Sequence, residues 1–349
     1  GYGCSLASGG RVAPLPERTI DAPSAETNAA IKTNDEIRAI VDAAIINNPS
    51  NHRAIVVMHD GEIISEGYAE GFSDKTPLLG WSMSKSVIGT LVGAAVEAGF
   101  LSLDDPIGAP EWPGGDDRSA LTWRHLLQMQ SGLAFDEDYR NLRSDAVRML
   151  FEQADAGAYA VRQPAAAPPN AMFNYSSGTT NILARALNDL LKENDTDIYA
   201  FATNRIFRPI GASSFVMEPD AAGNPVGSSF IYATARDWAR LGQLYLQDGV
   251  WADKPILPSG WTTFTQDPAS ESDGQYGGQV WLNRDGAFER ERDFPSLPES
   301  AYYFSGHEGQ FVLIMPSNNM VIARLGMTRR GSAEPAVDAL AADIISTLY

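Results

Sequence analysis

Cysteine is almost absent from this sequence: Cys4 is alone among 349 residues, so no disulfide can form within the chain. Lysine is also scarce, with five residues against 21 arginines, and the formal net charge is −18. Such an acidic chain is repelled by phosphate backbones and anionic lipids, which argues against nucleic acid and membrane surfaces as partners. No apolar run reaches the roughly 20 residues of a transmembrane helix, and the four histidines lack metal-ligand spacing. We therefore expect a globular protein without a transmembrane segment, a disulfide or a metal site.

The length allows one large domain or two smaller ones. The first 27 residues are rich in Ser, Gly, Ala and Pro, and we expect them to be flexible. Strand-like and helix-like runs alternate in residues 28–104 and 226–349, whereas residues 105–225 are mostly helix-like. We therefore expect an α/β domain built from both ends of the chain and a helical domain from its middle. No part of the sequence indicates an oligomeric state.

Cys4 follows Gly3 at the beginning of the sequence, where it is similar to the acylated cysteine of a bacterial lipoprotein. An ordinary flexible N-terminus is the alternative interpretation. Acylation of Cys4 would place a bacterial protein in the periplasm or on a membrane by a lipid anchor, and its absence would leave the protein in the cytoplasm.

Apolar periodicity and turn residues predict the main elements. Two β-rich runs, 54–59 and 62–65, flank Asp60-Gly61 and predict a hairpin. Further strands are expected at 277–282, 311–315 and 320–325. Helices are expected at 35–46, 82–98, 122–129, 144–153, 181–192, 197–207, 234–247 and 334–348.

Ser82 and Lys85 open the helix expected at 82–98. Residues three apart share one face of a helix, so the two side chains should lie side by side at its N-terminus. The ammonium and the helix dipole would both favour an oxyanion at the serine oxygen, and a desolvated lysine can act as a base. The alternative is that Ser82 is only a helix cap. A lysine in an otherwise apolar helix is costly to bury without a role or a partner, which favours the catalytic interpretation.

Four segments in a fixed order carry a resemblance to a known family. They are 81–86 (Trp-Ser-Met-Ser-Lys-Ser), 121–133 (Leu-Thr-Trp-Arg-His-Leu-Leu-Gln-Met-Gln-Ser-Gly-Leu), 173–177 (Phe-Asn-Tyr-Ser-Ser) and 306–310 (Gly-His-Glu-Gly-Gln). Together they resemble the serine β-lactamase and penicillin-binding-protein superfamily, and among its members the 6-aminohexanoate-dimer hydrolases and β-lactamase-like carboxylesterases. The resemblance implies an antiparallel sheet flanked by helices, an inserted helical domain and an active site between the two.

The second motif of this superfamily is Tyr-x-Asn, and two segments compete for it. Tyr139-Arg140-Asn141 matches literally, but Tyr175-Ser176-Ser177 has the family's flanking residues and is preferred. Ser177 in place of the asparagine looks like the nylon-oligomer hydrolases. The resemblance implies that Tyr175 is catalytic, that Ser177 bridges Lys85 and the substrate side, and that Tyr139 lies over the substrate. For both tyrosines, simple packing is the alternative.

The third motif is usually Lys-Thr-Gly on an edge strand, and His307-Glu308-Gly309 is expected to replace it. Loss of that lysine removes a cation that would pair with a β-lactam carboxylate, which argues against efficient antibiotic hydrolysis. Gly309 would let a substrate approach the backbone closely, whereas a histidine at a strand end without a role is the alternative for His307. The family pattern implies an oxyanion hole formed by the backbone N–H groups of Ser82 and Gln310.

The resemblance implies a serine hydrolase that cleaves ester or amide bonds through an acyl-enzyme on Ser82 and needs no cofactor. Lys85 and Tyr175 would share the proton transfers. Carboxylesterase activity is expected, with hydrolysis of 6-aminohexanoate oligomers as a further possibility and a β-lactamase or D-amino-acid peptidase as the alternative. The loops 108–119 and 134–170 are expected to form the entrance.

Two alternatives belong to other classes. An α/β-hydrolase would use Ser82 with His307, but the segment around Ser82 lacks the second glycine of a nucleophile elbow. A non-catalytic penicillin-binding-like module would bind without turnover, and an intact set of Ser82, Lys85 and Tyr175 argues against it.

Overall fold

An antiparallel sheet forms from the β-branched runs at the two ends of the chain. Residues 34–47, 51–286, 291–329 and 332–349 are described by the computed structural model, so Cys4 and the segment 1–27 lie outside the described residues. The strands follow the spatial order β2 (Glu62–Tyr68), β1 (His52–His59), β11 (Met320–Gly326), β10 (Gln310–Met315), β9 (Tyr302–Gly306) and β8 (Trp281–Leu282). All neighbouring pairs are antiparallel.

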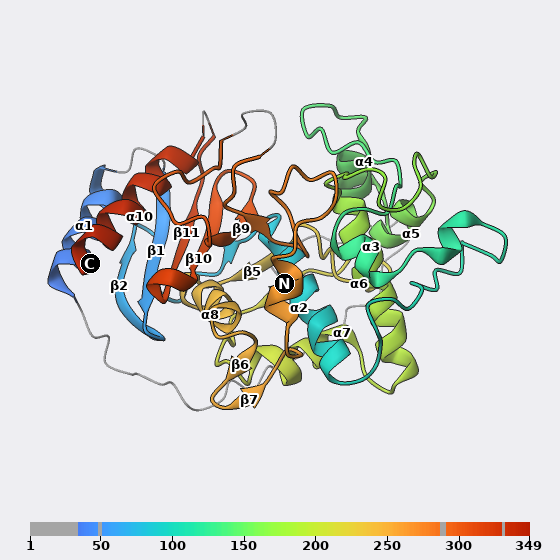
Figure 1. Ribbon diagram of the computed structural model, residues 1–349, viewed down its shortest axis with the longest axis horizontal. Helices are drawn as coiled ribbons and strands as arrows, with labels where there is room; N and C mark the ends of the chain where they lie inside the picture. Colours follow the sequence, from blue (N-terminus) through green and yellow to red (C-terminus); the bar gives the residue numbers. More distant parts are fainter. Residues whose placement is uncertain (1–33, 48–50, 287–290, 330–331) are drawn as a thin grey trace.

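Both faces of this sheet are covered by helices (Figure 1). On one face lie α1 (Asp35–Asn47) and α10 (Glu334–Leu348), and on the other lies α8 (Ala235–Leu246). The side chains of a strand point alternately to the two faces. Accordingly, Ile55 and Val57 of β1 pack into the core under α1 and α10, whereas Val56 packs into the larger core that includes α8. This two-sided burial explains why β1, β10 and β11 are almost continuously apolar.

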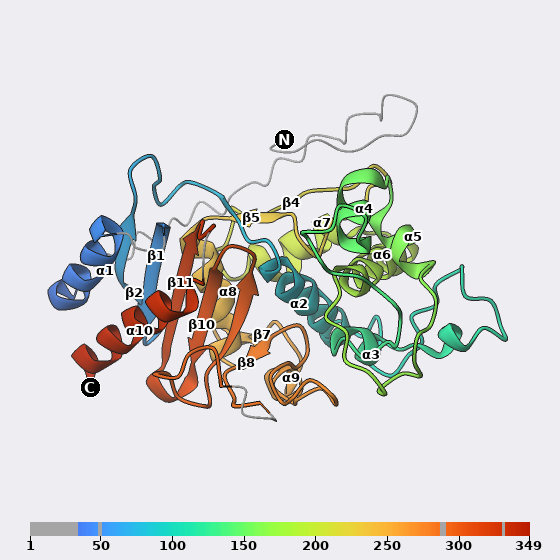
Figure 2. The ribbon, with the colours of Figure 1, turned by 90° about the horizontal axis from the view of Figure 1, so that it is seen from above.

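The helix α2 (Met83–Glu97) lies between the sheet and a group of helices at one end of the molecule (Figure 2). Every residue of α2 from Met83 to Ala95 is buried. The helical group consists of α3 (Trp123–Leu127), α4 (Asp145–Glu152), α5 (Ala156–Val161), α6 (Ser177–Glu193), α7 (Ile198–Ala202) and the π-helical turn η2 (Thr203–Phe207). The remaining elements are β3 (Leu78–Leu79), η1 (Asp117–Ala120), β4 (Val216–Met217), β5 (Ile231–Ala233), β6 (Val250–Trp251), β7 (Lys254–Pro255), α9 (Trp261–Thr265) and η3 (Pro316–Asn318).

The expected fold class, an antiparallel sheet flanked by helices with further helices from the middle of the chain, is confirmed. The hairpin around Asp60-Gly61 and the strands at 311–315 and 320–325 are also confirmed. So are the helices expected at 35–46, 82–98, 144–153, 234–247 and 334–348, within a residue or two at their ends. Division of the chain into domains at residues 104 and 225 stays a prediction.

Some predicted elements are wrong in part. Only Trp281–Leu282 of the run 277–282 is a strand, because Gln279 has a φ of 62° and its N–H bonds the Leu127 carbonyl instead of a neighbouring strand. The helix expected at 181–192 begins earlier, at Ser177, because the Ser176 side chain caps it by accepting from the Thr179 N–H. The strand β9 was not predicted, although it is the strand that reaches the site described below.

Close packing of α2 against α9 gives a test of the fold. A Cβ at Gly93 would lie 2.6 Å from the Trp261 ring, so Gly93→Ala should overpack this contact and lower the free energy of unfolding by about 1–3 kcal/mol. Urea denaturation measures the change. Gly114→Ala is the matched control, because nothing lies within 4 Å of a Cβ there; equal stability of the two variants would contradict the packing described.

Candidate active site

A cavity of about 560 Å³ opens where the N-terminal ends of α2 and α6 meet the end of β9. Its lining comes from residues that are far apart in the sequence. They are Ser82, Glu137, Tyr139, Tyr175, Trp281, Ser305, Gly306, His307, Glu308, Gly309, Thr328, Arg329, Ser332, Ala333 and Glu334. Two further predicted residues, Lys85 and Ser177, lie buried beneath it, with exposures of 1% and 0%.

Ser82 directly precedes α2, and its side chain makes no capping hydrogen bond. Ser82 thus occupies the N-cap position, but its hydroxyl does not cap the helix. The preceding residue, Trp81, has a φ of 49°, a left-handed conformation that is unfavourable for a bulky side chain. Such strain persists where the surroundings enforce it, and it is common at functional sites. The turn presents the Ser82 hydroxyl to the cavity.

Lys85 contacts three oxygen atoms. Its Nζ lies 3.1 Å from Ser82 Oγ, 3.0 Å from Ser177 Oγ and 3.1 Å from the Ser228 carbonyl oxygen. Burial lowers the pKa of Lys85 to about 8, an effect that the negative charge of Glu137 partly offsets. At pH 7 roughly a tenth of this lysine is therefore an uncharged amine with a lone pair, in hydrogen-bond contact with the serine, and this fraction grows as the pH rises.

Tyr175 lies next to both Ser82 and Lys85. The Lys85 Nζ is 4.9 Å from the centre of the Tyr175 ring, and the ring also packs against Tyr276 and Trp281. Burial raises the pKa of Tyr175 above its ordinary value, and a hydrogen bond with Ser82 partly offsets this rise. Tyr175 therefore keeps its proton at neutral pH and is placed to donate it.

Ser177 joins Tyr139 to the buried lysine. Its Oγ lies 3.2 Å from the Tyr139 hydroxyl and 3.0 Å from Lys85 Nζ. The Tyr139 ring stacks on His307, with 5.8 Å between ring centres. The literal Tyr-x-Asn match at Tyr139 and the variant match at Tyr175 thus both line one cavity.

The segment His307-Glu308-Gly309 was expected on an edge strand, but this expectation is wrong: the segment forms the turn between β9 and β10. A hydrogen bond of 3.1 Å from the Gly309 N–H to the Gly306 carbonyl closes the turn. Glu308 and Gly309 both have positive φ, 60° and 83°. A Cβ at Gly309 would lie 2.4 Å from Ala333, so glycine is needed there for packing, in addition to its place in the lining.

The turn changes which backbone N–H groups face the cavity. Gln310 is 3% exposed, pairs with Gly306 in the sheet and is not among the lining residues. His307 does line the cavity. The preceding residue, Gly306, packs against the Gly80 carbonyl so closely that a Cβ at position 306 would lie 2.1 Å from that oxygen, and this glycine lets the end of β9 approach the segment before Ser82. Within the described part of the chain, the N–H groups of Ser82 and His307 donate no hydrogen bond. His307 therefore replaces Gln310 as the candidate for the second oxyanion donor.

Arg324 on β11 holds this turn by hydrogen bonds to its backbone. Its fully buried guanidinium donates to the carbonyl oxygens of Glu308 and Gly309 and, at 3.0 Å, to Thr328 Oγ1. Its Nε donates to His52 Nδ1 at 3.0 Å. Burial, together with the charge of Arg324, lowers the pKa of His52 to about 4, so the ring stays neutral and can accept.

Sequence reasoning missed Glu137, the Ser228 carbonyl, Trp281 and Arg324. Glu137 accepts hydrogen bonds from Ser177 and Tyr139, but in the sequence it is one of several acidic residues in a polar segment. A backbone carbonyl carries no side-chain signal. The one clue to Arg324 in the sequence is that it is a charged residue within an otherwise apolar run, 320–325, that predicts a buried strand.

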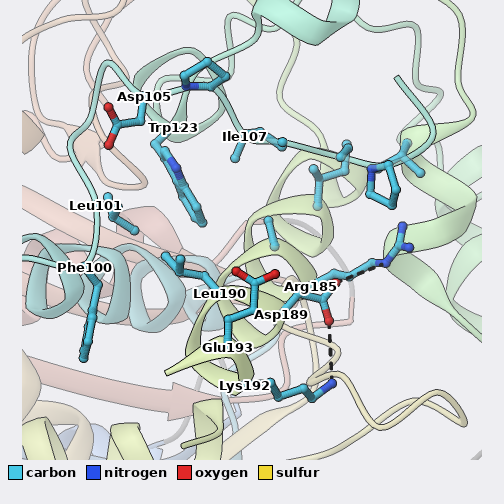
Figure 3. Close-up of a pocket in the computed structure, with 17 residues that line it drawn as sticks. Phe100, Leu101, Asp105, Ile107, Trp123, Arg185, Asp189, Leu190, Lys192 and Glu193 are labelled. Carbon is cyan, nitrogen blue, oxygen red and sulfur yellow. Dashed lines mark ion pairs between the residues drawn. The ribbon is translucent and has the colours of Figure 1, made fainter. Parts of the chain in front are cut away.

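A second cavity, of about 630 Å³, lies between the segment 100–110 and the C-terminal half of α6 (Figure 3). Trp123, Ile107 and Leu101 line one side, and Asp189 pairs with Arg185 and Lys192 on the other. Residues 108–110 line this cavity and not the one at Ser82, so the loop 108–119 does not form the expected entrance. Of the loop 134–170, Glu137 and Tyr139 do line the site.

Other features of the described chain bear on the site's chemistry. None of the described helices has both the length and the apolar composition to cross a membrane. In the residues that the structure describes, no three His, Cys, Asp or Glu side chains are grouped as metal ligands.

Comparison with known proteins places this geometry in context. Residues 50–346 match the family model described as Beta-lactamase. An uncharacterized protein from Alkalihalophilus pseudofirmus is 23% identical over 290 residues, 78% of this chain and 82% of that protein. A 6-aminohexanoate-dimer hydrolase from Paenarthrobacter ureafaciens is 26% identical over 222 residues, which span 60% of this chain and just over half, 55%, of the relative.

The fold has solved counterparts. A Bacillus anthracis protein provisionally described as a 6-aminohexanoate-dimer hydrolase superposes with a TM-score of 0.72 at 21% identity, over 87% of this chain and 81% of that one. At this identity the similarity shows the fold alone.

Loss of the Arg324 side chain tests how the turn is held. Arg324→Met keeps most of the side-chain volume but leaves the Glu308 and Gly309 carbonyls without these donors, at a cost of about 1–3 kcal/mol per unsatisfied group. We expect the urea midpoint to fall accordingly. Arg140→Met removes an arginine whose side chain is 92% exposed, and its midpoint should not move. An Arg324→Met protein as stable as the wild type would show that the turn does not depend on Arg324.

Proposed function

The chain belongs to the beta-lactamase family, and from this premise we propose that it is a serine hydrolase that cleaves ester or amide bonds through an acyl-enzyme on Ser82. The observation that carries the proposal is the contact between the Ser82 hydroxyl and a buried lysine whose pKa is lowered to about 8. A nucleophile in hydrogen-bond contact with a base, which is itself held by further groups, is the usual arrangement of nucleophilic catalysis.

In the proposed mechanism Lys85 is the base and Tyr175 is the acid. Ser82 Oγ attacks the carbonyl carbon while the uncharged Lys85 amine takes the serine proton. Tyr175 then donates its proton to the leaving alcohol or amine, and the bond to the leaving group breaks. The two pKa shifts fit the starting state of this mechanism, because burial disfavours the charged form of each group: the lysine loses its proton more easily, and the tyrosine keeps its proton until the leaving group takes it.

The backbone N–H groups of Ser82 and His307 are the proposed oxyanion hole. Each such donor contributes about 3 kcal/mol of transition-state stabilisation. The Arg324 hydrogen bonds to the turn carbonyls would hold the His307 peptide in place. In hydrolysis of the acyl-enzyme, water would attack the acyl carbon and give its proton to the Tyr175 oxygen, which lost one during acylation. The Lys85 ammonium would return its proton to Ser82 Oγ as the acyl–oxygen bond breaks, which restores the starting state.

An ester, or a short amide such as the 6-aminohexanoate dimer, is the proposed substrate. The similarity to a 6-aminohexanoate-dimer hydrolase supports the amide. Esters are the less demanding substrates because their leaving group departs more readily. At the position where the family has a lysine, the exposed ring of His307 lines the cavity. An ammonium that would pair with a β-lactam carboxylate is therefore missing from that position, which favours an esterase or amidase over a β-lactamase.

Substitution of the three catalytic candidates tests the assignment. Ser82→Ala and Lys85→Met should each lower kcat/KM for p-nitrophenyl acetate, by at least about a thousandfold for the serine. Tyr175→Phe should lower kcat/KM by about a hundredfold or more for the 6-aminohexanoate linear dimer, whose amine must be protonated to leave. The loss should be smaller for p-nitrophenyl acetate, because p-nitrophenolate leaves without a proton. The same variants should be assayed with the 6-aminohexanoate linear dimer and with nitrocefin. Lys75→Met is the matched control, because Lys75 is exposed and outside the cavity.

The outcomes separate the alternatives. An Lys85→Met variant that keeps most of its activity would contradict the mechanism. If the wild type turns over none of the three substrates but is covalently labelled at Ser82, the non-catalytic module is the better description. Efficient nitrocefin hydrolysis would instead favour the β-lactamase.

The pH dependence follows from the lysine. The active form carries an uncharged amine, whose fraction grows as the pH rises through about 8. We therefore expect kcat/KM for p-nitrophenyl acetate to rise to a plateau with an apparent pKa of about 8, after subtraction of the rate measured with Ser82→Ala. No fall is expected below the range where tyrosine ionises, because burial raises the pKa of Tyr175. A rate that declines as the pH rises through 8 would contradict Lys85 as the base.

A further inference from the structure

Glu137 is bound to the first residue of α6 by two hydrogen bonds. The Ser177 N–H donates to Glu137 Oε2 at 2.8 Å, and the Ser177 hydroxyl donates to Oε1 at 2.5 Å. The Tyr139 hydroxyl also donates to Oε1, at 3.2 Å. A carboxylate at a helix N-terminus is favoured by the helix dipole, and α6 is 17 residues long. The carboxylate is thus fixed relative to Ser177.

This contact decides what Ser177 can offer to Lys85. A serine hydroxyl has one hydrogen and two lone pairs. Its hydrogen is committed to Glu137 in a short, charge-assisted bond, so Ser177 Oγ can only accept from Lys85 Nζ, 3.0 Å away. The second partner of the lysine, the Ser228 carbonyl, is an acceptor by nature.

An uncharged lysine amine has two hydrogens and one lone pair. Its three oxygen contacts are Ser177 Oγ, the Ser228 carbonyl and Ser82 Oγ. If the first two can only accept, they take both hydrogens and the lone pair is left facing the Ser82 hydroxyl. Without the carboxylate, the Ser177 hydroxyl could turn and donate to that lone pair, and the amine would then be directed away from the nucleophile.

We propose that Glu137 is a positioning residue that, through Ser177, directs the lone pair of Lys85 at Ser82 and balances the charge that Lys85 gains. The proposal rests on the function proposed above and deepens it. When Ser82 Oγ bonds to a substrate, its proton moves to Lys85 Nζ and a buried ammonium forms. A negative charge one hydrogen bond beyond Ser177 stabilises that ammonium, as preorganised groups do in enzyme sites.

Other titratable groups surround this line of residues. Tyr139 and Tyr175 flank it, and His307 stacks on Tyr139. The remaining charged residues of the cavity lining are Glu308, Arg329 and Glu334. Of these acidic residues, Glu137 is the one hydrogen-bonded to a partner of Lys85 in the described structure.

Labelling of Ser82 with a fluorophosphonate tests the proposal without a known substrate. In this reaction the Ser82 Oγ–P bond forms, the P–F bond breaks, fluoride leaves and the serine proton passes to Lys85. The second-order rate is measured by intact mass spectrometry between pH 5.5 and 10 for the wild type, Glu137→Gln, Ser177→Ala and Asp138→Asn. Asp138→Asn is the matched control, because it removes a charge one residue away that pairs with Arg140 in the exposed part of the loop.

Glu137→Gln should have two separate effects. The plateau rate at high pH should fall about ten- to a hundredfold, the range for loss of one charge-assisted hydrogen bond. The rising limb should also move to lower pH by roughly one unit, because an uncharged neighbour no longer favours the ammonium. Ser177→Ala should also show the lower plateau rate. If Glu137→Gln does not fold, Ser177→Ala serves as the test of that effect. Asp138→Asn should match the wild type in both respects.

A structural role alone would change the free energy of unfolding without moving the pH limb, so urea denaturation of each variant accompanies the assay. A folded Glu137→Gln variant with the plateau rate and the pH dependence of the wild type would overturn the positioning role of Glu137. If Ser82→Ala and Lys85→Met are at the same time not labelled, the proposed serine hydrolase function is still supported. A wild type that is not labelled at Ser82 would overturn both.

Discussion

A lysine with 1% exposure is the constraint on which this structure depends. Burying an ammonium without partners is prohibitively costly, so the protein must either supply acceptors or let the proton leave. Here it does both: three oxygen atoms surround Lys85 Nζ, and burial lowers the pKa to about 8. The three acceptors come from the residue before α2, the first residue of α6 and the segment before β5. Formation of the site and assembly of these elements are therefore one event.

The sheet contributes residues to the candidate site from the end of β9 and not from the middle of its strands. β9 reaches Ser82 because Gly306 allows close approach to the Gly80 carbonyl. The following turn then places the His307 peptide and ring at the cavity, and Arg324 holds that turn from the next strand but one. A buried guanidinium that donates to backbone carbonyls adds to the packing contacts that hold the turn. Two buried basic side chains thus serve the proposed site: Lys85 for the chemistry and Arg324 for the turn beside it.

The sequence allowed much of this to be predicted, for identifiable reasons. The spacing of Ser82 and Lys85 follows from helical periodicity, which is local, and the apolar runs of β1, β10 and β11 are long enough to read as strands. Tyr175 was preferred over Tyr139 from its flanking residues, and both tyrosines line the cavity. The segment His307-Glu308-Gly309 was wrongly expected on a strand because β9 ends earlier, at Ser305-Gly306, which has no distinctive motif, whereas the residues that follow form a turn.

The sequence by itself determined most of the helices and the long strands, and the placement of Ser82 beside Lys85, because both depend on residues that are close in the sequence. Only the tertiary structure decided which groups surround Ser82 and Lys85. Glu137 and the Ser228 carbonyl reach the site through contacts between residues 40 and 143 positions apart, and Arg324 reaches it from another strand. No local sequence pattern encodes such contacts. The tertiary structure also decided that His307, and not Gln310, lines the cavity with Ser82, because His307 lies in the turn after β9 whereas Gln310 already pairs with Gly306 in the sheet.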